Sequence, residues 1–303
     1  MKNYKFCFFS VVLTLLVLNV NAQIKIGPLF SDDMILQRNS KVSIWGEADA
    51  NQKISIQSSW DKKKTTTQSD ADGNWSVKIE TPKAGGPYNI DIKSSNSTVK
   101  LSNVLIGEVW ITSGQSNMQM TLNGYANEPI LGSLDMIANA NNSNIRLFTF
   151  ERVTSKEPIR SIKGKWLVSN SENTAAFTAI GYSFAKYLNK VLDVPIGIIN
   201  TSWGGTPAEA WTDSKTLEDN FKKSEIKNFT ENKRKSHDPS ALFNAMINPL
   251  IPFKIRGALW YQGESNVRRA NNYTKLMNVM IDGWRREWNQ RVFPFLFCSN
   301  CSI

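Results

Sequence analysis

A serine that follows an apolar run is the first candidate for chemistry in this chain of 303 residues. Residues 109–111 read Val-Trp-Ile and lead into Ser-Gly-Gln-Ser-Asn at 113–117. Many hydrolases present a nucleophilic serine in this way, at the end of a short strand, where a backbone N–H of the turn can hold an oxyanion. Serines in turns are also common without a catalytic role, so this loop alone leaves both interpretations of Ser116 open.

Two later stretches repeat the pattern of an apolar run followed by a small polar loop. The mostly apolar residues 195–199 lead into Asn-Thr-Ser-Trp-Gly-Gly-Thr at 200–206, and residues 257–260 lead into Tyr-Gln-Gly-Glu-Ser-Asn at 261–266. Strands of a parallel sheet end at a common edge, where α/β proteins place their sites. The sequence therefore predicts one site built from three loops, which we call block one (113–117), block two (200–206) and block three (261–266).

The three blocks together resemble the sialate O-acetylesterases, which are sugar-deacetylating members of the SGNH hydrolase superfamily. The resemblance runs from about residue 26 to residue 297, and its specificity comes from the ordered trio, because each block alone is a weak motif. It implies an α/β fold with a three-layer α/β/α hydrolase domain around a parallel sheet. It also implies removal of O-acetyl groups from sialic acids or related glycans.

The resemblance also implies a role for each block. Ser116 would be the nucleophile, and its own backbone N–H would be one oxyanion donor. Block two would supply a second donor, the N–H of Gly204 or Gly205. Block three would supply a side-chain amide, from Gln262 or Asn266. We expect each donor to lower the barrier by roughly 3–4 kcal/mol. Further candidates for the substrate pocket are Gln115, Asn117, Trp203 and Glu264.

The base that such a serine needs is missing from its usual place. In the family it is a histidine three residues after an aspartate, near the carboxyl end, and this sequence has no such motif. The one histidine is His237, which lies between blocks two and three. Triads are defined by geometry and not by chain order, so His237 stays open as a base, although the matching family segment leads into a structural helix.

The tail of the chain offers an explanation for the missing base. Residues 298–303 read Cys-Ser-Asn-Cys-Ser-Ile, where the family continues its strand with Val-Gln-Ile/Leu-Ala-Pro-Phe. The observed tail can be encoded by codons that, when translated from the second base of the first codon, give Val-Gln-Ile-Ala-Pro. We therefore hypothesise a frameshift after Phe297, which would leave the hydrolase domain incomplete and its activity low. A nucleotide sequence that cannot encode the second reading frame would contradict this hypothesis. Cys298 and Cys301 would then be accidental, and not a redox pair or half a zinc site.

The remaining sequence predicts the segments that must position these loops. Residues 1–22 have a basic start, an apolar stretch and small residues before Gln23, which is typical of a cleaved signal peptide and a periplasmic or secreted product. The alternative is a membrane anchor, but the stretch is short for a bilayer. Residues 23–104 alternate apolar and polar side chains, which predicts a small antiparallel β-sandwich-like domain. Residues 105–303 form the predicted hydrolase domain.

Within the hydrolase domain, strands are expected to alternate with helices. The predicted strands are 105–112, 145–150, 195–201, 255–261 and 293–297. The predicted helices are 174–192 with Thr174 as N-cap, 238–252, and 271–288. In the first helix the stripe expected to face inward is Phe177, Ile180, Phe184, Tyr187, Leu188 and Val191.

Charge and composition narrow the partners. The chain carries 36 basic and 26 acidic residues, a net charge of +10 that falls to +8 without Lys2 and Lys5. The basic residues are scattered, so we expect an acetylated glycan as partner, with no nucleic acid and no membrane span after signal cleavage. We expect no metal and no cofactor, because no ligand cluster or phosphate loop stands out. The alternatives are an acetylxylan-type esterase of the same fold and a non-catalytic sugar-binding remnant.

Overall fold

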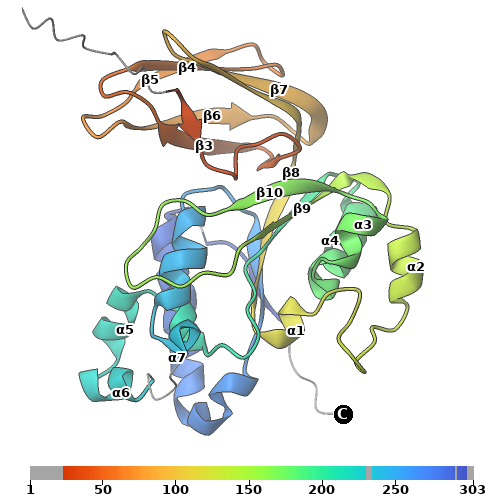
Figure 1. The fold of residues 1–303 in the computed structure, drawn as a ribbon, viewed down its shortest axis with the longest axis vertical. Helices are drawn as coiled ribbons and strands as arrows, with labels where there is room; N and C mark the ends of the chain where they lie inside the picture. The colour runs from red at the N-terminus through yellow and green to blue at the C-terminus, as the bar shows by residue number, and fades with distance from the viewer. Residues whose placement is uncertain (1–22, 230–233, 291, 299–303) are drawn as a thin grey trace, which may run out of the picture.

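The computed structural model describes residues 23–229, 234–290 and 292–298, and it shows a β-rich region stacked on an α/β region (Figure 1). The predicted signal peptide at 1–22 and the tail at 299–303 lie outside the described residues. Within the part that is described, no helix is long and apolar enough to cross a membrane.

The β-rich region consists of two sheets that face each other across an apolar core. One sheet has the order β1-β3-β6 and is antiparallel, and the other contains β4, β5, β7 and the first part of β8. Ile44, Ile56 and Trp75 are buried between them, as the period of two requires. The first seven strands are β1 (Lys25–Ile26), β2 (Ile35–Gln37), β3 (Ser40–Glu47), β4 (Lys53–Ser58), β5 (Lys64–Gln68), β6 (Asn74–Thr81) and β7 (Gly85–Lys93). Strand β5 was not predicted because it contains no apolar residue.

One long strand, β8 (Thr98–Gly114), belongs to both regions. Its first part pairs antiparallel with β7, and its last part pairs parallel with β11 (Ile196–Asn200) and β12 (Gly257–Tyr261). The predicted domain boundary between residues 104 and 105 therefore falls inside a continuous strand. As a result, the strand that leads to Ser116 is anchored in the β-rich region.

The α/β region is built on a mixed sheet with the order β10-β9-β11-β8-β12-β13. Neighbours are parallel except β10, which runs antiparallel to β9 at one edge. The strands not yet defined are β9 (Asn142–Phe150), β10 (Gly164–Ser169) and β13 (Phe295–Phe297). All five predicted strands are present, and β10 is an addition to the parallel arrangement that was expected.

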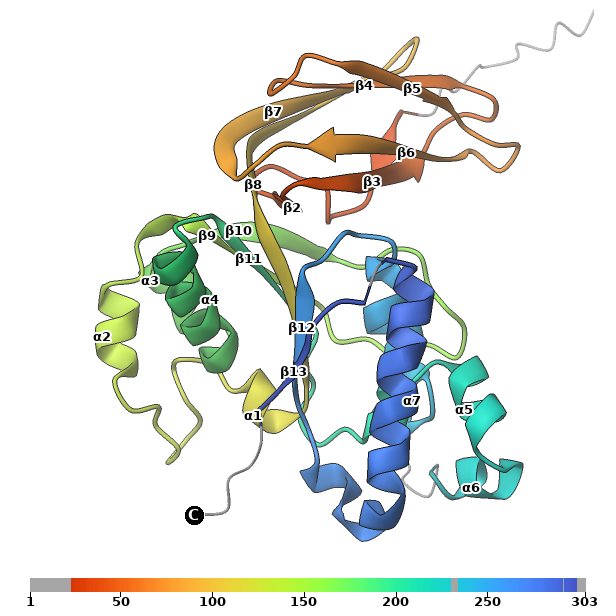
Figure 2. The ribbon, with the colours of Figure 1, turned by 180° about the vertical axis from the view of Figure 1, so that it is seen from behind.

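Helices cover both faces of this sheet, which makes three layers. Figures 1 and 2 show α2, α3 and α4 on one face and α5, α6 and α7 on the other. The α-helices are α1 (Ser116–Gln119), α2 (Ser133–Ala138), α3 (Ser171–Ala175), α4 (Ala179–Leu192), α5 (Ser214–Asn220), α6 (Lys223–Asn228) and α7 (Ala270–Trp288). Short irregular turns are η1 (Ala208–Trp211), η2 (Lys235–His237), η3 (Phe243–Ile247), η4 (Asn248–Leu250) and η5 (Glu264–Arg269).

The helix predicted from Thr174 is wrong in its start and in part of its inward face, although Phe177, Phe184 and Leu188 pack in the core as expected. Two helices occur instead, α3 capped by Asn170 and α4 capped by Thr178, whose side chain accepts from Gly181 N. Thr178 also donates to the Met118 carbonyl at 2.6 Å, which fixes a cap where continuous helix was expected. The buried face of α4 contains small residues and Tyr182, because the helix packs closely on the sheet.

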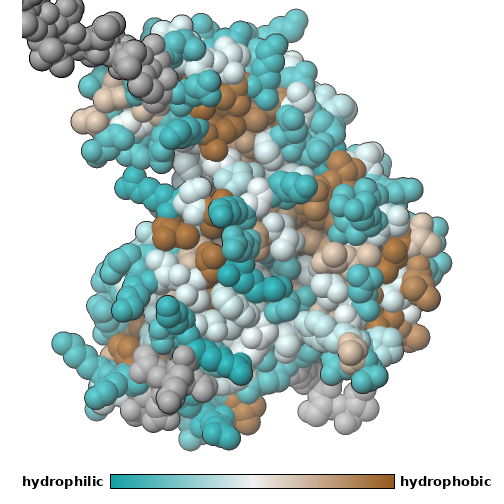
Figure 3. Space-filling view, viewed as in Figure 1, coloured by the Kyte–Doolittle hydropathy of each residue, from teal (hydrophilic) through white to brown (hydrophobic). Residues whose placement is uncertain are grey.

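Part of the predicted inward stripe is therefore exposed to solvent. Tyr187 and Val191 are 69% and 59% exposed, and on α2 and its approach Leu134 and Leu131 are 82% and 98% exposed. Figure 3 shows apolar surface over α2.

The second and third predicted helices have different outcomes. The segment expected to be helical at 238–252 is helical from 241 to 250, but only its first two residues are α-helical, and the buried π-helical turn η3 and 3₁₀ turn η4 follow them. The third helix is confirmed as α7, with Leu276, Met280 and Trp284 buried as expected.

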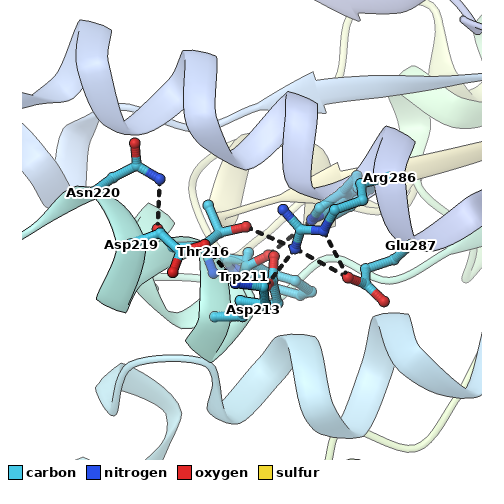
Figure 4. A network of polar contacts seen from close by, with 9 residues as sticks. Trp211, Asp213, Thr216, Asp219, Asn220, Arg286 and Glu287 are labelled. Atoms are coloured by element: carbon cyan, nitrogen blue, oxygen red, sulfur yellow. Dashed lines mark hydrogen bonds and ion pairs between the residues drawn. The ribbon is translucent and has the colours of Figure 1, made fainter.

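A polar network holds α5 and α7 together beneath the site (Figure 4). Asp213 caps α5 by accepting from Thr216 N at 2.9 Å, and Arg286 of α7 donates to the same carboxylate oxygen at 2.8 Å. Trp284 Nε1 donates to the Trp211 carbonyl at 2.9 Å. The network therefore fixes η1, the turn that directly follows block two.

Candidate active site

Block one is a tight turn between β8 and α1. Gly114 has φ +133°, and a Cβ there would overlap the carbonyl oxygen of Tyr261, so the position requires glycine. Gln115 follows as the residue before α1, and Ser116 is the first residue of that short helix. Ser116 is half-buried at the carboxyl edge of the sheet, which is where the sequence predicted the serine to lie.

Block three lies directly beside block one. Gln115 N donates to the Tyr261 carbonyl at 2.9 Å, and the Gln115 side-chain oxygen accepts from Ser265 N at 3.1 Å. Asn117 Nδ2 donates to Glu264 Oε1 at 2.7 Å. These bonds join the two loops by backbone and side chain, and they place Gln115, Asn117 and Glu264 around the serine turn.

Block two closes the other side of the serine turn. Trp203 N donates to the Gly114 carbonyl at 3.0 Å, and a Cβ at Gly204 would lie 3.6 Å from Ser116 Cα. The nearest atom to a Cβ at Gly205 would instead be Nη1 of Arg234, at 3.9 Å. Of the two candidate glycines, Gly204 is therefore the one that adjoins Ser116.

The Gly204 N–H already has an acceptor. It donates to Gln119 Oε1 at 2.6 Å, and Gln119 is the last residue of α1. An oxyanion that uses this N–H would have to displace the Gln119 amide oxygen. Gln119 was not among the residues that the sequence predicted for the site.

The two amides of block three are buried and hydrogen-bonded to each other. Gln262 and Asn266 are 8% and 2% exposed. Gln262 Nε2 donates to Asn266 Oδ1 at 2.7 Å and to the Thr206 carbonyl at 3.2 Å. Asn266 Nδ2 donates to Glu209 Oε2 at 2.8 Å. Gln262 thus contacts block two directly, and Asn266 contacts a carboxylate that the sequence prediction had not assigned.

The tryptophans near the blocks divide into core and site residues. Trp110, Trp211 and Trp260 are each at most 6% exposed and belong to the apolar core. Trp203 is only half-buried and follows β11 in block two. Among these four, Trp203 is thus the one whose ring remains accessible beside the serine turn.

A cavity of about 770 Å³ opens next to blocks two and three. Gly205, Glu264 and Ser265 are among its lining residues. The remaining lining residues are Pro207, Glu225, Phe229, His237, Arg268, Arg269 and Asn272. Charges of both signs surround it, which fits a polar ligand such as a sugar better than an apolar one.

His237 lies in the wall of this cavity and is buried. Burial lowers the pKa of its imidazole below the ordinary value of 6.5, and the nearby Arg234 and Arg269 guanidiniums act in the same direction, opposed by Asp238. The imidazole is therefore neutral at pH 7, the form that accepts a proton. Among the described residues, no hydrogen bond joins His237 to Ser116.

The cysteine motif lies only partly within the described residues. Cys298 is a half-buried free thiol, and burial raises its pKa. Cys301 lies outside the described residues. In the part of the chain that is described, no cluster of three or more His, Cys, Asp or Glu side chains could hold a metal.

Known proteins with similar sequences are carbohydrate esterases. A family model described as carbohydrate esterase, sialic acid-specific acetylesterase, matches residues 106–300. Sialate O-acetylesterase of Rattus norvegicus is 29% identical over 344 residues, covering 95% of this chain and 63% of the relative. The Homo sapiens protein of the same name is 29% identical over 293 residues, covering 88% of this chain and 55% of the relative. The chain thus spans between 55% and 63% of the length of these relatives.

A solved structure has the same architecture. It is a carbohydrate acetylesterase from Xanthomonas citri, with a TM-score of 0.82 and 33% sequence identity. The match covers 90% of this chain and 60% of that chain. It includes both the β-rich region and the mixed sheet, since neither region alone amounts to that share.

Proposed function

Because the chain belongs to the carbohydrate esterase family of sialic acid-specific acetylesterases, we propose that it removes O-acetyl groups from sialic acids or related glycans with Ser116 as nucleophile. The observation that carries the proposal is the convergence of three loops on one turn. Gly204 adjoins Ser116 on one side, and block three is hydrogen-bonded to Gln115 on the other.

The proposed reaction is acyl transfer to serine followed by hydrolysis. Ser116 Oγ attacks the acetyl carbonyl, the bond to the sugar oxygen breaks, and water then releases acetate from the acyl-enzyme. The oxyanion would accept from the N–H groups of Ser116 and Gly204 and from the Gln262 amide. The Gln262 N–H that donates to the Thr206 carbonyl makes the longer bond, at 3.2 Å. This N–H would therefore change most readily to an anionic acceptor.

The proposal also concerns the base that would take the proton of Ser116. The one imidazole in the sequence, His237, is neutral at pH 7 but not hydrogen-bonded to Ser116. We propose that His237 is not the base, and we therefore expect His237→Asn to leave the rate of acetate release unchanged. If His237 were the base, its loss would lower kcat on the order of 10⁴- to 10⁶-fold.

Processing and location belong to the same proposal. We propose that residues 1–22 are a signal peptide and that the mature protein acts in the periplasm or outside the cell. Sequencing of the amino terminus of the protein recovered from cells tests this, with Gln23 as the expected first residue. An intact Met1 on the recovered protein would contradict it.

The decisive experiment is acetate release from two substrates by matched serine variants. We expect release from O-acetylated sialic acid to exceed release from acetylated xylo-oligosaccharides, and Ser116→Ala to lower it to the uncatalysed rate. Ser113→Ala is the control, because Ser113 Oγ is buried in the same loop without a hydrogen-bond partner. Preference for xylo-oligosaccharides would favour the acetylxylan-type alternative. Sugar binding without turnover in both variants would favour a binding remnant.

A further inference from the structure

We infer that Glu209 is a positioning residue that holds the Gln262 amide with its NH₂ group toward block two. The inference rests on the proposed esterase function, because Gln262 is there an oxyanion donor. Glu209 is 1% exposed and lies in η1, directly after block two. A carboxylate so deeply buried needs partners on both oxygens, and its partners define what it does.

Both oxygens of Glu209 are used. Oε1 accepts from Arg269 Nε at 3.0 Å, and Oε2 accepts from Asn266 Nδ2 at 2.8 Å. The arginine lies partly exposed in the cavity wall, and the asparagine is 2% exposed. The carboxylate therefore connects the cavity to the buried amide pair.

A carboxylate can only accept and a backbone N–H can only donate, so Glu209 and the Ala208 N–H together decide which way the amide between them points. Asn266 must turn its NH₂ group to Glu209, which leaves Oδ1 to accept from Ala208 N at 3.0 Å and from Gln262 Nε2 at 2.7 Å. Gln262 must then turn its NH₂ group to Asn266 and its oxygen to Tyr273, whose one hydroxyl proton is shared between this oxygen at 2.8 Å and the Gln262 carbonyl at 2.7 Å. The two ends of an amide have almost the same shape, so the order of donors and acceptors, and not packing, fixes both orientations.

The same order separates the two amides of block three. The oxygen of Asn266 faces two donors and one of its N–H groups is bound to Glu209. This side chain therefore belongs to the chain of hydrogen bonds Glu209–Asn266–Gln262, which we call the relay. Gln262 instead extends an N–H to the Thr206 carbonyl of block two over the longer distance of 3.2 Å. The relay therefore assigns Asn266 to orientation and leaves Gln262 as the amide that can serve an oxyanion.

The backbone of Glu209 is also held in place. Its carbonyl accepts from Ser240 N at 3.0 Å and from Thr212 N at 3.3 Å. Ser240 has φ +62°, a conformation that a residue other than glycine adopts at a cost, and it is buried. A strained residue that fixes the carbonyl of Glu209 is consistent with a position that tolerates little movement.

The test is Glu209→Gln, which keeps the shape of the side chain and removes its acceptor-only character. The new amide will turn its oxygen to Arg269, which can only donate, and its NH₂ group to Asn266. Asn266 then meets a second NH₂ group where it had an acceptor, and a reversal would set its NH₂ group against the Ala208 N–H and the Gln262 oxygen against the Thr206 carbonyl. The Gln262 amide therefore loses its single orientation, and in the 303-residue protein NMR should show weaker nuclear Overhauser contacts between its NH₂ group and Thr206.

The kinetic readout is the rate of p-nitrophenyl acetate hydrolysis above that of Ser116→Ala. For Glu209→Gln we expect kcat to fall by about 10- to 100-fold with KM changed less than about threefold, since a donor to the oxyanion is lost. Glu209→Asp keeps an acceptor-only carboxylate and should recover part of the loss. Tyr273→Phe leaves the hydrogen bonds from Glu209 through Asn266 to Gln262 in place, so kcat should fall by less than about fivefold.

The outcomes separate the inference from the proposed function. Unchanged Gln262 contacts in Glu209→Gln, or a larger effect from Tyr273→Phe than from Glu209→Gln, would overturn the positioning role. If Glu209→Gln fails to fold, the NMR spectrum of Tyr273→Phe tests the inference instead. A reversal of the Gln262 amide in that variant would show that Tyr273, and not Glu209, sets its orientation. A rate that Ser116→Ala does not lower would contradict the proposed function, while the NMR contacts would still report on the relay.

Discussion

Two asparagine–glutamate hydrogen bonds of nearly equal length flank the serine turn in opposite surroundings. Asn117 donates to Glu264 at 2.7 Å in an exposed position, and Asn266 donates to Glu209 at 2.8 Å in a buried one. Water can replace the first bond, but it cannot reach the second. The buried pair must therefore hold its geometry, whereas the exposed pair can open when a ligand enters.

The difference shows how the site divides its work. On the amide side, Gln262, Asn266 and Glu209 have internal partners and are each at most 8% exposed. On the serine side, Ser116 and Gln119 are half-buried and their loop is joined to its neighbours by replaceable bonds. Burial, and not the length of a bond, thus marks the part of the site that has to stay fixed.

The largest effect should come from Gly114, where the backbone of the serine turn lies closest to β12. Gly114→Ala would force a Cβ against the Tyr261 carbonyl at φ +133°, and we expect a loss of more than about 4 kcal/mol of unfolding free energy. Gly132→Ala is the matched control, because φ is +73° there but no atom lies within 4 Å, so about 1 kcal/mol is expected. Urea unfolding measures both, and equal losses would show that the turn is not constrained by β12.

The two asparagines test the comparison directly. Asn266→Ala leaves Glu209 and the Ala208 N–H without a partner in the core, and we expect it to cost about 3 kcal/mol. Asn117→Ala removes a bond of the same kind in an exposed position and should change stability by less than about 0.5 kcal/mol. Similar losses in urea unfolding would mean that burial does not separate the two sides.

Gln119 tests whether the serine side can rearrange. Gln119→Ala removes the oxygen that occupies the Gly204 N–H, and we expect methylboronic acid, which forms a tetrahedral anionic adduct with serine, to bind about 3- to 10-fold more tightly. Gln119→Glu should weaken the same binding, because an anion would then occupy the donor. Calorimetric titration measures both variants, and changes of the same sign would exclude competition for this N–H.

The smallest effect concerns His237. Its pKa is lower in the folded protein than the ordinary 6.5, so the unfolded chain binds more protons as the pH falls below that value. The stability associated with this residue is therefore present above pH 6.5 and lost on acidification. His237→Asn should reduce the slope of unfolding free energy between pH 7.5 and 5.5, and an unchanged slope would contradict the burial of this imidazole.

Much of the fold follows from local patterns, and the exceptions have physical causes. The strands ending in blocks one, two and three are apolar runs with polar loops, and they lie side by side as predicted. The predicted inward stripe of α4 was wrong at Tyr187 and Val191, because the face that packs closely on the sheet includes the small residues Gly181 and Ala185. A sequence pattern records apolar character but not the space available beneath a helix.

The candidate site could be predicted only as far as its loops. The sequence indicates Ser116 and the glycines of block two, because turn chemistry is local. Glu209 was missed because its partners lie 57 and 60 residues away, and a single acidic residue between alanines carries no pattern of its own. That apolar setting was nevertheless a signal, since a carboxylate flanked by Ala208 and Ala210 is expected to be buried and paired.

The sharing of β8 between two sheets has a mechanical consequence. A hinge needs a segment whose backbone can rotate, and the 17 residues of this strand are hydrogen-bonded along the whole passage from β7 to β11 and β12. A twist of the β-rich region is therefore transmitted along β8 to the turn that carries Ser116. In that sense the amino-terminal region serves as a support for the turn that carries Ser116.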